Sequence, residues 1–255
     1  MTLHEVLDGL SCLSLRSIAL AVREPAQLRP YTSYCLKRYE ELAGLGLPSR
    51  NPVVPGAEDT ITLPAAHPGG GMSFGELVIL ARATKTLKPA AVFEMGSYNG
   101  LTTAIFILNS PPDARIYSLD LPPDLAEPDA DLHTDRHLVA NRQVGSVPEA
   151  LGLADVYTQM FCDSMLFDPA PYADSIDLGL VDAAHDAEHV RNDTIKMATM
   201  MTDHGVVFWH DYGGKGSMRP LAQYLESVGQ TCELFRIPET TLAWAPAKTL
   251  KSARL

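Results

Sequence analysis

The sequence has few cysteines and no closely spaced pair of them. Its four cysteines are Cys12, Cys35, Cys162 and Cys232. A disulfide framework or a structural zinc site needs cysteines at short, regular intervals such as C-x-x-C. We therefore expect reduced thiols in a cytoplasmic protein.

Long apolar runs and a secretory signal are missing as well. No run reaches the roughly 18 apolar residues that a membrane-spanning helix needs. Glu5 and Asp8 stand near the start, with no basic segment before an apolar stretch, so we expect neither a secretory signal nor a membrane partner.

Lysine and arginine form no cluster. The chain has 31 acidic and 20 basic residues, which give a formal net charge of −11. Binding nucleic-acid phosphates requires clustered positive charge. The acidic residues are spread along the chain, so the composition favours a small-molecule ligand over nucleic acid.

The sequence has ample apolar residues for a folded core. Its 255 residues are 46% hydrophobic, which suits one α/β domain with an addition. Residues 2–23 and 28–43 have helical spacing of apolar residues, and glycines and prolines then interrupt the pattern. We predict an N-terminal helical extension at residues 1–56 and a ligand-binding domain at residues 57–255. The extension would be a lid, a homodimer surface or simple packing.

Strand-like and helix-like patterns alternate from residue 73 onward, which predicts a mostly parallel sheet. The expected strands are residues 91–95, 115–120, 155–161, 176–182, 205–211, 232–237 and 241–246. No helix-length segment separates the last two strands, so they should pair as an antiparallel hairpin. Ser73 followed by Glu76 is a capping-box pattern and predicts that a helix begins there.

The most informative segment is AVFEMGSYNGLTT at residues 91–103. An apolar run containing Glu94 is followed by Gly96 and Gly100 in G-x-x-x-G spacing, and then by a helical pattern. A strand, a glycine turn and a helix present backbone N–H groups to a ligand. Dinucleotide-binding turns usually read G-x-G-x-x-G. Tyr98 stands where the middle glycine would be, which disfavours an NAD dehydrogenase.

This acid-x-Gly-x-x-x-Gly pattern resembles motif I of the class I S-adenosylmethionine (SAM) methyltransferases. Its E-x-G-x-Y-x-G form resembles the catechol O-methyltransferase-like group. The resemblance extends from about Ser73 to Pro246. It implies a Rossmann-like α/β fold, in which helices cover both faces of a seven-stranded sheet that is mostly parallel with an antiparallel last strand. It also implies SAM as cofactor, with a binding site that includes Glu94, Gly96, Tyr98, Gly100 and Thr102.

Polar residues also follow the second and third expected strands, where open α/β sheets bind ligands. Asp120 ends the second strand, and its carboxylate can accept hydrogen bonds from both hydroxyls of a ribose. A helix-capping or loop role is the alternative. Asp163 and Ser164 follow the third strand and resemble the turn that contacts adenine, with ordinary loop polarity as the alternative.

Asp182 and Asp211 end the fourth and fifth strands and should face one crevice, with Asp182 also bordering the cofactor. In the catechol-type family, the residues that resemble this pair bind Mg²⁺, which prefers oxygen ligands. The sequence departs from that family at Tyr212, where a third ligand is expected, and at His185, where the family has a basic lysine. The strings DAAHD and FWHDY also resemble a broader bacterial group in which a metal cannot be assumed.

His185 is the expected catalytic base, because histidine titrates near neutral pH. His210 is a second candidate base, with a buried structural role as the alternative. His189 lies one helical turn after His185 and could share its face. The H-E-x-x-H order is absent, so we discount a metalloprotease.

The expected function is SAM-dependent O-methylation of a hydroxyl on a small metabolite, as in secondary metabolism. His185 would act as the base, while Asp182 and Asp211 orient the substrate or a divalent cation. Two alternatives remain: an enzyme of this fold with non-methylating chemistry, and a non-catalytic nucleoside-binding subunit. Specificity would come from the N-terminal helices, residues 121–133, Lys215 and Arg219.

Overall fold

The computed structural model describes residues 47–48, 50, 60–64, 71–122, 143–213 and 218–255. The chain divides into two units, Met1–Pro48 and Ser49–Leu255, and the description concerns the second. The predicted helices at residues 2–23 and 28–43 lie outside the described residues, as do Lys215 and most of the segment 121–133. The predicted boundary at residue 56 therefore stays a prediction. None of the described helices combines the length and hydrophobicity needed to cross a bilayer.

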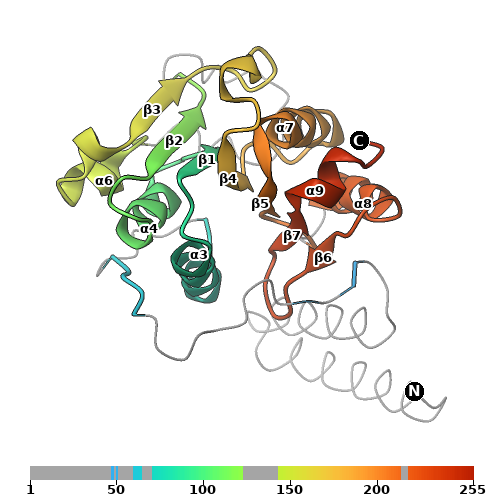
Figure 1. Cartoon of the computed structure of the whole chain (residues 1–255), viewed down its shortest axis with the longest axis horizontal. Coiled ribbons are helices and arrows are strands. Elements are labelled where there is room, and N and C mark those ends of the chain that lie inside the picture. Colours follow the sequence, from blue (N-terminus) through green and yellow to red (C-terminus); the bar gives the residue numbers. More distant parts are fainter. Residues whose placement is uncertain (1–46, 49, 51–59, 65–70, 123–142, 214–217) are drawn as a thin grey trace, which may run out of the picture. The chain divides into compact units, whose positions relative to one another are not determined.

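A seven-stranded sheet forms the centre of the second unit (Figure 1). The strands are β1 (Ala91–Met95), β2 (Arg115–Asp120), β3 (Thr158–Phe161), β4 (Ile176–Val181), β5 (Met201–Trp209), β6 (Phe235–Arg236) and β7 (Ala243–Pro246). Their order is β3-β2-β1-β4-β5-β7-β6. Neighbours from β3 to β5 pair in parallel, and β7 runs antiparallel to both β5 and β6. The expected mostly parallel sheet with a reversed last strand is confirmed.

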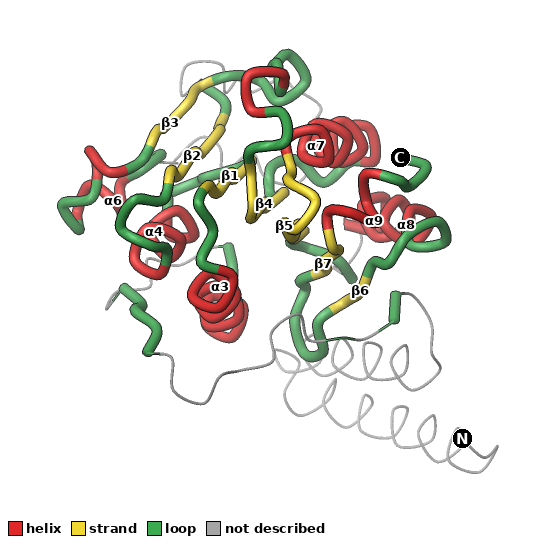
Figure 2. Tube along the Cα trace, viewed as in Figure 1, coloured by secondary structure: helices red, strands yellow, loops and turns green. Residues whose placement is uncertain are grey.

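Helices lie on both sides of this sheet (Figure 2). The helices are α3 (Phe74–Leu87), α4 (Leu101–Asn109), α6 (Ser146–Ala150), α7 (Ala187–Met200), α8 (Arg219–Val228) and α9 (Ala247–Lys251), with short 3₁₀ turns η2 (Ala154–Val156) and η3 (Ala170–Tyr172). α3 and α4 pack against each other, while α7 contacts α8 and α9. In chain order, β2 and β3 are added on one side of β1, and β4 and β5 are added on its other side. The strand order therefore reverses between β1 and β4, which is where open α/β sheets bind ligands.

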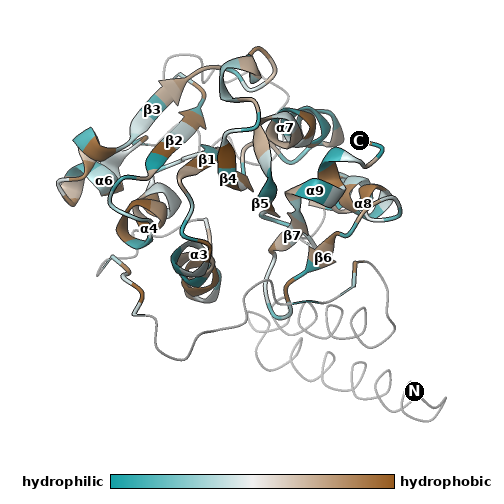
Figure 3. Cartoon of the chain, viewed as in Figure 1, coloured by the Kyte–Doolittle hydropathy of each residue, from teal (hydrophilic) through white to brown (hydrophobic). Residues whose placement is uncertain are grey.

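The central strands are apolar because both of their faces are covered. Every residue of β1 is buried, and only Asp177 of β4 is not. Figure 3 shows the hydrophobic colouring of β4 in the middle of the sheet. The helix predicted at Ser73 is confirmed as α3, and its capping box is complete: the Ser73 side chain accepts from the Glu76 N–H, and the Glu76 carboxylate accepts from the Ser73 N–H.

Several strand ends differ from the predicted ones. β3 begins at Thr158 because Ala154–Val156 forms a 3₁₀ turn. β5 begins at Met201, directly after α7. Its first half includes the exposed polar residues Asp203 and His204, so the apolar pattern begins only at Gly205. The hairpin strands β6 and β7 are shorter than expected but pair antiparallel as predicted.

Candidate functional site

The glycine turn after β1 depends on close backbone approach. Gly96 has a φ of +92°, and a Cβ at this position would lie 2.1 Å from the carbonyl oxygen of Asp182. Gly100 precedes α4 with a φ of +81°, and its Cβ would lie 2.7 Å from Pro148 Cδ. Tyr98, between them, is left-handed with a φ of 48°. Non-glycine residues rarely adopt this conformation, and those that do often lie at binding sites.

Asp120 lies beside this turn at the end of β2. Its Oδ2 accepts hydrogen bonds from the N–H groups of Ser97 (3.1 Å) and Tyr98 (2.8 Å). Its Oδ1 accepts from the N–H of Leu121. Sequence reasoning anticipated Asp120 at the ligand edge, and the structure adds that its carboxylate fixes the glycine turn directly.

Glu94 is buried where β1, β2 and α4 meet. Its Oε2 accepts hydrogen bonds from the hydroxyls of Thr103 and Ser118. Its Oε1 has no hydrogen-bond partner among the described residues. Burial, together with the charges of Asp182 and Asp120, outweighs the two hydroxyl hydrogen bonds and raises the pKa of Glu94 to about 8.

The remaining predicted cofactor residues lie in two other places. Thr102 is buried in α4, and its hydroxyl contacts Met72 Sδ at 3.9 Å. Asp163 follows β3 and caps its own turn, where its Oδ1 accepts from the N–H of Met165 at 2.8 Å. The carbonyl of Ser164 accepts from Asn192 and Lys196 of α7. None of these contacts joins the three residues to the acidic strand ends of β4 and β5.

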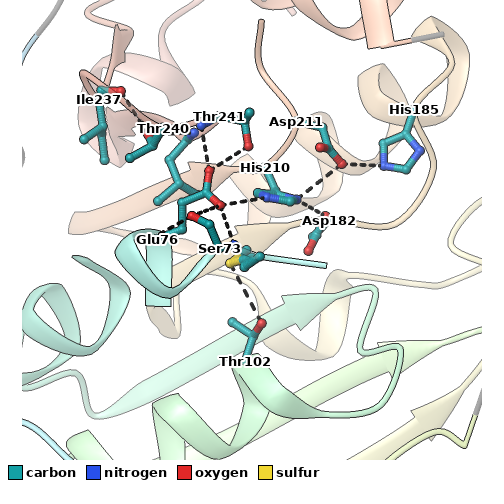
Figure 4. Close-up of polar contacts among 12 residues, drawn as sticks. Ser73, Glu76, Thr102, Asp182, His185, His210, Asp211, Ile237, Thr240 and Thr241 are labelled. Carbon is teal, nitrogen blue, oxygen red and sulfur yellow. Dashed lines mark hydrogen bonds and ion pairs between the residues drawn. The ribbon is translucent and has the colours of Figure 1, made fainter. Parts of the chain in front are cut away.

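Two aspartates and two histidines gather at the ends of β4 and β5 (Figure 4). His185 Nε2 lies 2.9 Å from Asp211 Oδ2. His210 Nδ1 lies 3.1 Å from Asp182 Oδ1 and 3.2 Å from the same Asp211 oxygen. The structure therefore brings together all four residues that the sequence assigned to chemistry at this edge. His189 instead pairs with Asp186, which caps α7.

A fifth charged residue, Glu76, extends this cluster from α3. Its Oε2 lies 3.6 Å from His210 Nε2, an ion-pair distance. Its Oε1 accepts from the N–H and the hydroxyl of Thr241, at 2.6 Å and 2.7 Å. Sequence reasoning identified Glu76 only as a helix cap. The capping box was the one sequence signal for Glu76, because the other partners of this residue come from distant parts of the chain.

The members of the cluster shift one another's pKa values. Burial alone lowers the pKa of His210, but the charge and hydrogen bond of Asp182, together with the close contacts to Asp211 and Glu76, raise it far above its ordinary value. Burial raises the pKa of Asp182, which His210 only partly offsets. Despite burial, hydrogen bonds from His185 and His210 hold the pKa of Asp211 well below its usual range. This upward shift favours the protonated ring of His210, and the role of His210 as a second base stays a prediction.

The donor set at this edge does not fit the predicted Mg²⁺. Ligand atoms of Asp182, His185 and Asp211 lie within 4.8 Å of one another, close enough to hold a metal ion. One of the three is an imidazole nitrogen, which suits transition metals, whereas Mg²⁺ takes oxygen ligands. Tyr212 replaces the expected third oxygen ligand, and its hydroxyl donates to Glu226. His210 Nδ1 already contacts both carboxylates.

Comparisons with known proteins agree with this fold. Residues 93–212 match a protein family described as a methyltransferase domain. The search of curated proteins found no significant match. Among solved structures, the cofactor-bound Rv0187 from MTB is 17% identical, with a TM-score of 0.53 over 73% of this chain and 84% of that one. The SAH-bound methyltransferase PaMTH1 of Podospora anserina is 13% identical, with a TM-score of 0.52 over 68% and 78%.

The strand order and the domain match agree with the resemblance stated from the glycine turn. Residues 93–212 match a methyltransferase domain, and the two solved structures share the fold.

Proposed function

We propose that this protein transfers the methyl group of SAM to a hydroxyl oxygen of a small molecule. One observation carries the proposal: the glycine turn contacts the end of β4, which bears Asp182. This residue belongs to the group formed by Asp182, His185, His210 and Asp211, called the Asp–His cluster below. Gly96 packs on the backbone of Asp182, whose N–H donates to the Met95 carbonyl at 2.8 Å. A cofactor held by the turn would thus lie next to groups able to orient and deprotonate an acceptor.

The cofactor would occupy the turn and the neighbouring strand ends. Gly96, Tyr98 and Gly100 would border its amino-acid end, with the N-terminus of α4 and Thr102 behind them. Asp120 would accept from the ribose hydroxyls, and Asp163 and Ser164 would border the adenine. The acceptor side would be lined by Asp182 and Asp211. Glu94 is buried beneath the glycine turn, so it would support the cofactor site from below.

His185 would serve as the general base. The acceptor hydroxyl gives its proton to His185 while its oxygen attacks the methyl carbon in line with the sulfonium. The C–O bond forms as the S–CH₃ bond breaks, leaving S-adenosylhomocysteine (SAH). The 2.9 Å contact of His185 Nε2 with Asp211 supports this role, because a carboxylate orients an imidazole and stabilises the imidazolium that forms. A positioned base contributes about 10²–10⁴-fold.

No step of this mechanism runs through a metal ion. Mg²⁺ is left out of this proposal, because the donor set near Asp182 and Asp211 includes an imidazole and lacks a third oxygen ligand. A homodimer, a cytoplasmic location and a role in secondary metabolism remain predictions of the sequence. Arg219, at the start of α8, is proposed to contribute to acceptor specificity.

Mass spectrometry with trideuteromethyl-labelled SAM tests the function directly. We expect a panel of phenols, catechols and hydroxylated acids to include an acceptor that gains one labelled methyl group on oxygen, with one SAH formed per methyl. SAM consumption without a methylated product would instead favour non-methylating chemistry. Tight SAH binding with no turnover on any acceptor would favour a nucleoside-binding subunit. Transfer to nitrogen or carbon would contradict the assignment to oxygen.

A further inference from the structure

We propose that Glu76 of α3 is a positioning residue for the Asp–His cluster: it fixes the ring of His210 and the turn at Thr241, and thereby holds Asp211 in place. This inference rests on the proposed methyl transfer, in which Asp211 orients the catalytic base. Glu76 itself would not touch the substrate.

The contacts of Glu76 exceed what a helix cap needs. Its side chain is 5% exposed, whereas a capping carboxylate needs only one backbone donor and tolerates solvent. Burying a carboxylate is costly unless it is paired and hydrogen-bonded. Here one oxygen accepts from the N–H and hydroxyl of Ser73 and faces His210, and the other accepts twice from Thr241. These contacts link three separate segments of the chain to one carboxylate.

The two sides of Glu76 converge on Asp211. On one side, Glu76 faces Nε2 of His210, while Nδ1 of the same ring contacts Asp182 and Asp211. A five-membered ring held at both nitrogens cannot rotate away from the carboxylates. On the other side, the Thr241 carbonyl accepts from the N–H of Tyr212 at 2.8 Å. The residues before and after Asp211 are therefore both tied to Glu76.

Asp211 needs this support because its backbone is left-handed, with a φ of 63°. A non-glycine residue keeps such a conformation only where its surroundings over-determine it. Asp211 Oδ2 must also meet both His185 and His210. A small shift of this residue would move His185 relative to the acceptor, and misplacement by about 1 Å can cost about 10²-fold in rate.

Glu76→Gln tests the role, with Ser73→Ala as the matched control. Glutamine keeps the shape and can still accept from Thr241 through Oε1, but it offers an amide NH₂ toward Ser73 and His210. Ser73→Ala removes the capping hydroxyl and leaves every contact of Glu76 with His210 and Thr241. We expect Glu76→Gln to lower kcat by about 10–10²-fold, with acceptor KM and SAH affinity unchanged. Ser73→Ala should lower the melting temperature but leave kcat intact.

A second readout does not depend on activity. In ligand-free, ¹⁵N-histidine-labelled protein, the ring nitrogens of His210, assigned by their loss in His210→Gln, should shift in Glu76→Gln and stay unchanged in Ser73→Ala. Unchanged His210 resonances in Glu76→Gln would overturn the proposal. So would equal losses of kcat in both variants, which would mean that the cap alone matters. If the wild type methylated no acceptor, the proposed function would fail, while the resonances would still decide whether Glu76 positions His210.

Discussion

A single oxygen, Asp211 Oδ2, joins the two imidazoles of the site. His185 approaches it at 2.9 Å and His210 at 3.2 Å. Despite burial, its contacts with three carboxylates raise the pKa of His210, which favours a positively charged ring beside Asp211. His185 contacts only one of these carboxylates among the described ion pairs. In the proposed mechanism the two histidines therefore differ in role: His210 would hold the carboxylates in place, and His185 would accept the proton.

His185→Ala should lower kcat by about 10²–10⁴-fold, because it removes the base without touching the glycine turn. SAH affinity, measured by calorimetry, should stay at the wild-type level. His204→Ala is the matched control, since His204 is 80% exposed and pairs with Asp177 at the start of β4. Wild-type turnover in His185→Ala would remove this residue from the mechanism.

Glu94→Gln should change how stability depends on pH. The pKa of Glu94 rises from 4.5 to about 8 on folding, so between these values the folded protein binds more protons than the unfolded chain. The contribution of Glu94 is therefore present in full below pH 4.5 and is lost as pH rises toward 8. Glutamine keeps the neutral form at every pH and removes this loss.

Urea unfolding at several pH values measures the effect. Relative to its own stability at pH 5, Glu94→Gln should lose less than the wild type by pH 8, by on the order of a few kcal/mol. The other titrating groups are common to both proteins and cancel in the difference. Parallel pH profiles for the two proteins would show that Glu94 is not held protonated by burial.

At the scale of elements, the sequence predicted those helices and strands whose formation depends on residues close together in the chain. The apolar runs of β1, β2 and β4 and the capping box of α3 were readable because burial and capping depend on neighbouring residues. The start of β3 was not, because η2 competes for the same residues. Glu76 escaped detection for a different reason. Its partners His210 and Thr241 lie beside the paired strands β5 and β7, far from Glu76 in sequence, and no local pattern specifies such contacts.

Gly96→Ala tests the contact between the glycine turn and β4. Alanine there combines a left-handed φ with a Cβ 2.1 Å from the Asp182 carbonyl, so we expect a loss of about 3 kcal/mol or more in stability and of SAH binding. Gly213→Ala is the matched control: its φ is +76°, and its Cβ would meet nothing within 4 Å. That variant should lose only about 1–2 kcal/mol. Equal losses in chemical denaturation would mean that the close approach at Asp182 costs nothing.

At the scale of the whole molecule, strand order brings the two halves of the site together. Because the order reverses between β1 and β4, the glycine turn after β1 lies directly beside Asp182 after β4. The parallel pairing of β4 with β5 then places Asp211 next to Asp182. The strand order therefore places the glycine turn, the proposed cofactor site, next to the groups that would orient and deprotonate the acceptor.

Binding of a ligand at this site can be measured as an increase in the stability of the whole folded protein. A ligand that binds only the folded state at 100 times its Kd stabilises by about 2.7 kcal/mol, which for a domain of this size raises the melting temperature by about 5–10 °C. We expect SAH to produce this rise. Mg²⁺ should produce no such rise, and EDTA should leave methyl transfer intact. The three residues close enough to hold an ion include the imidazole of His185, and the hydroxyl of Tyr212, which stands at the expected third ligand position, donates to Glu226. A saturable rise in melting temperature with Mg²⁺, lost in Asp182→Asn, would show that Asp182 and Asp211 bind this ion despite the imidazole beside them.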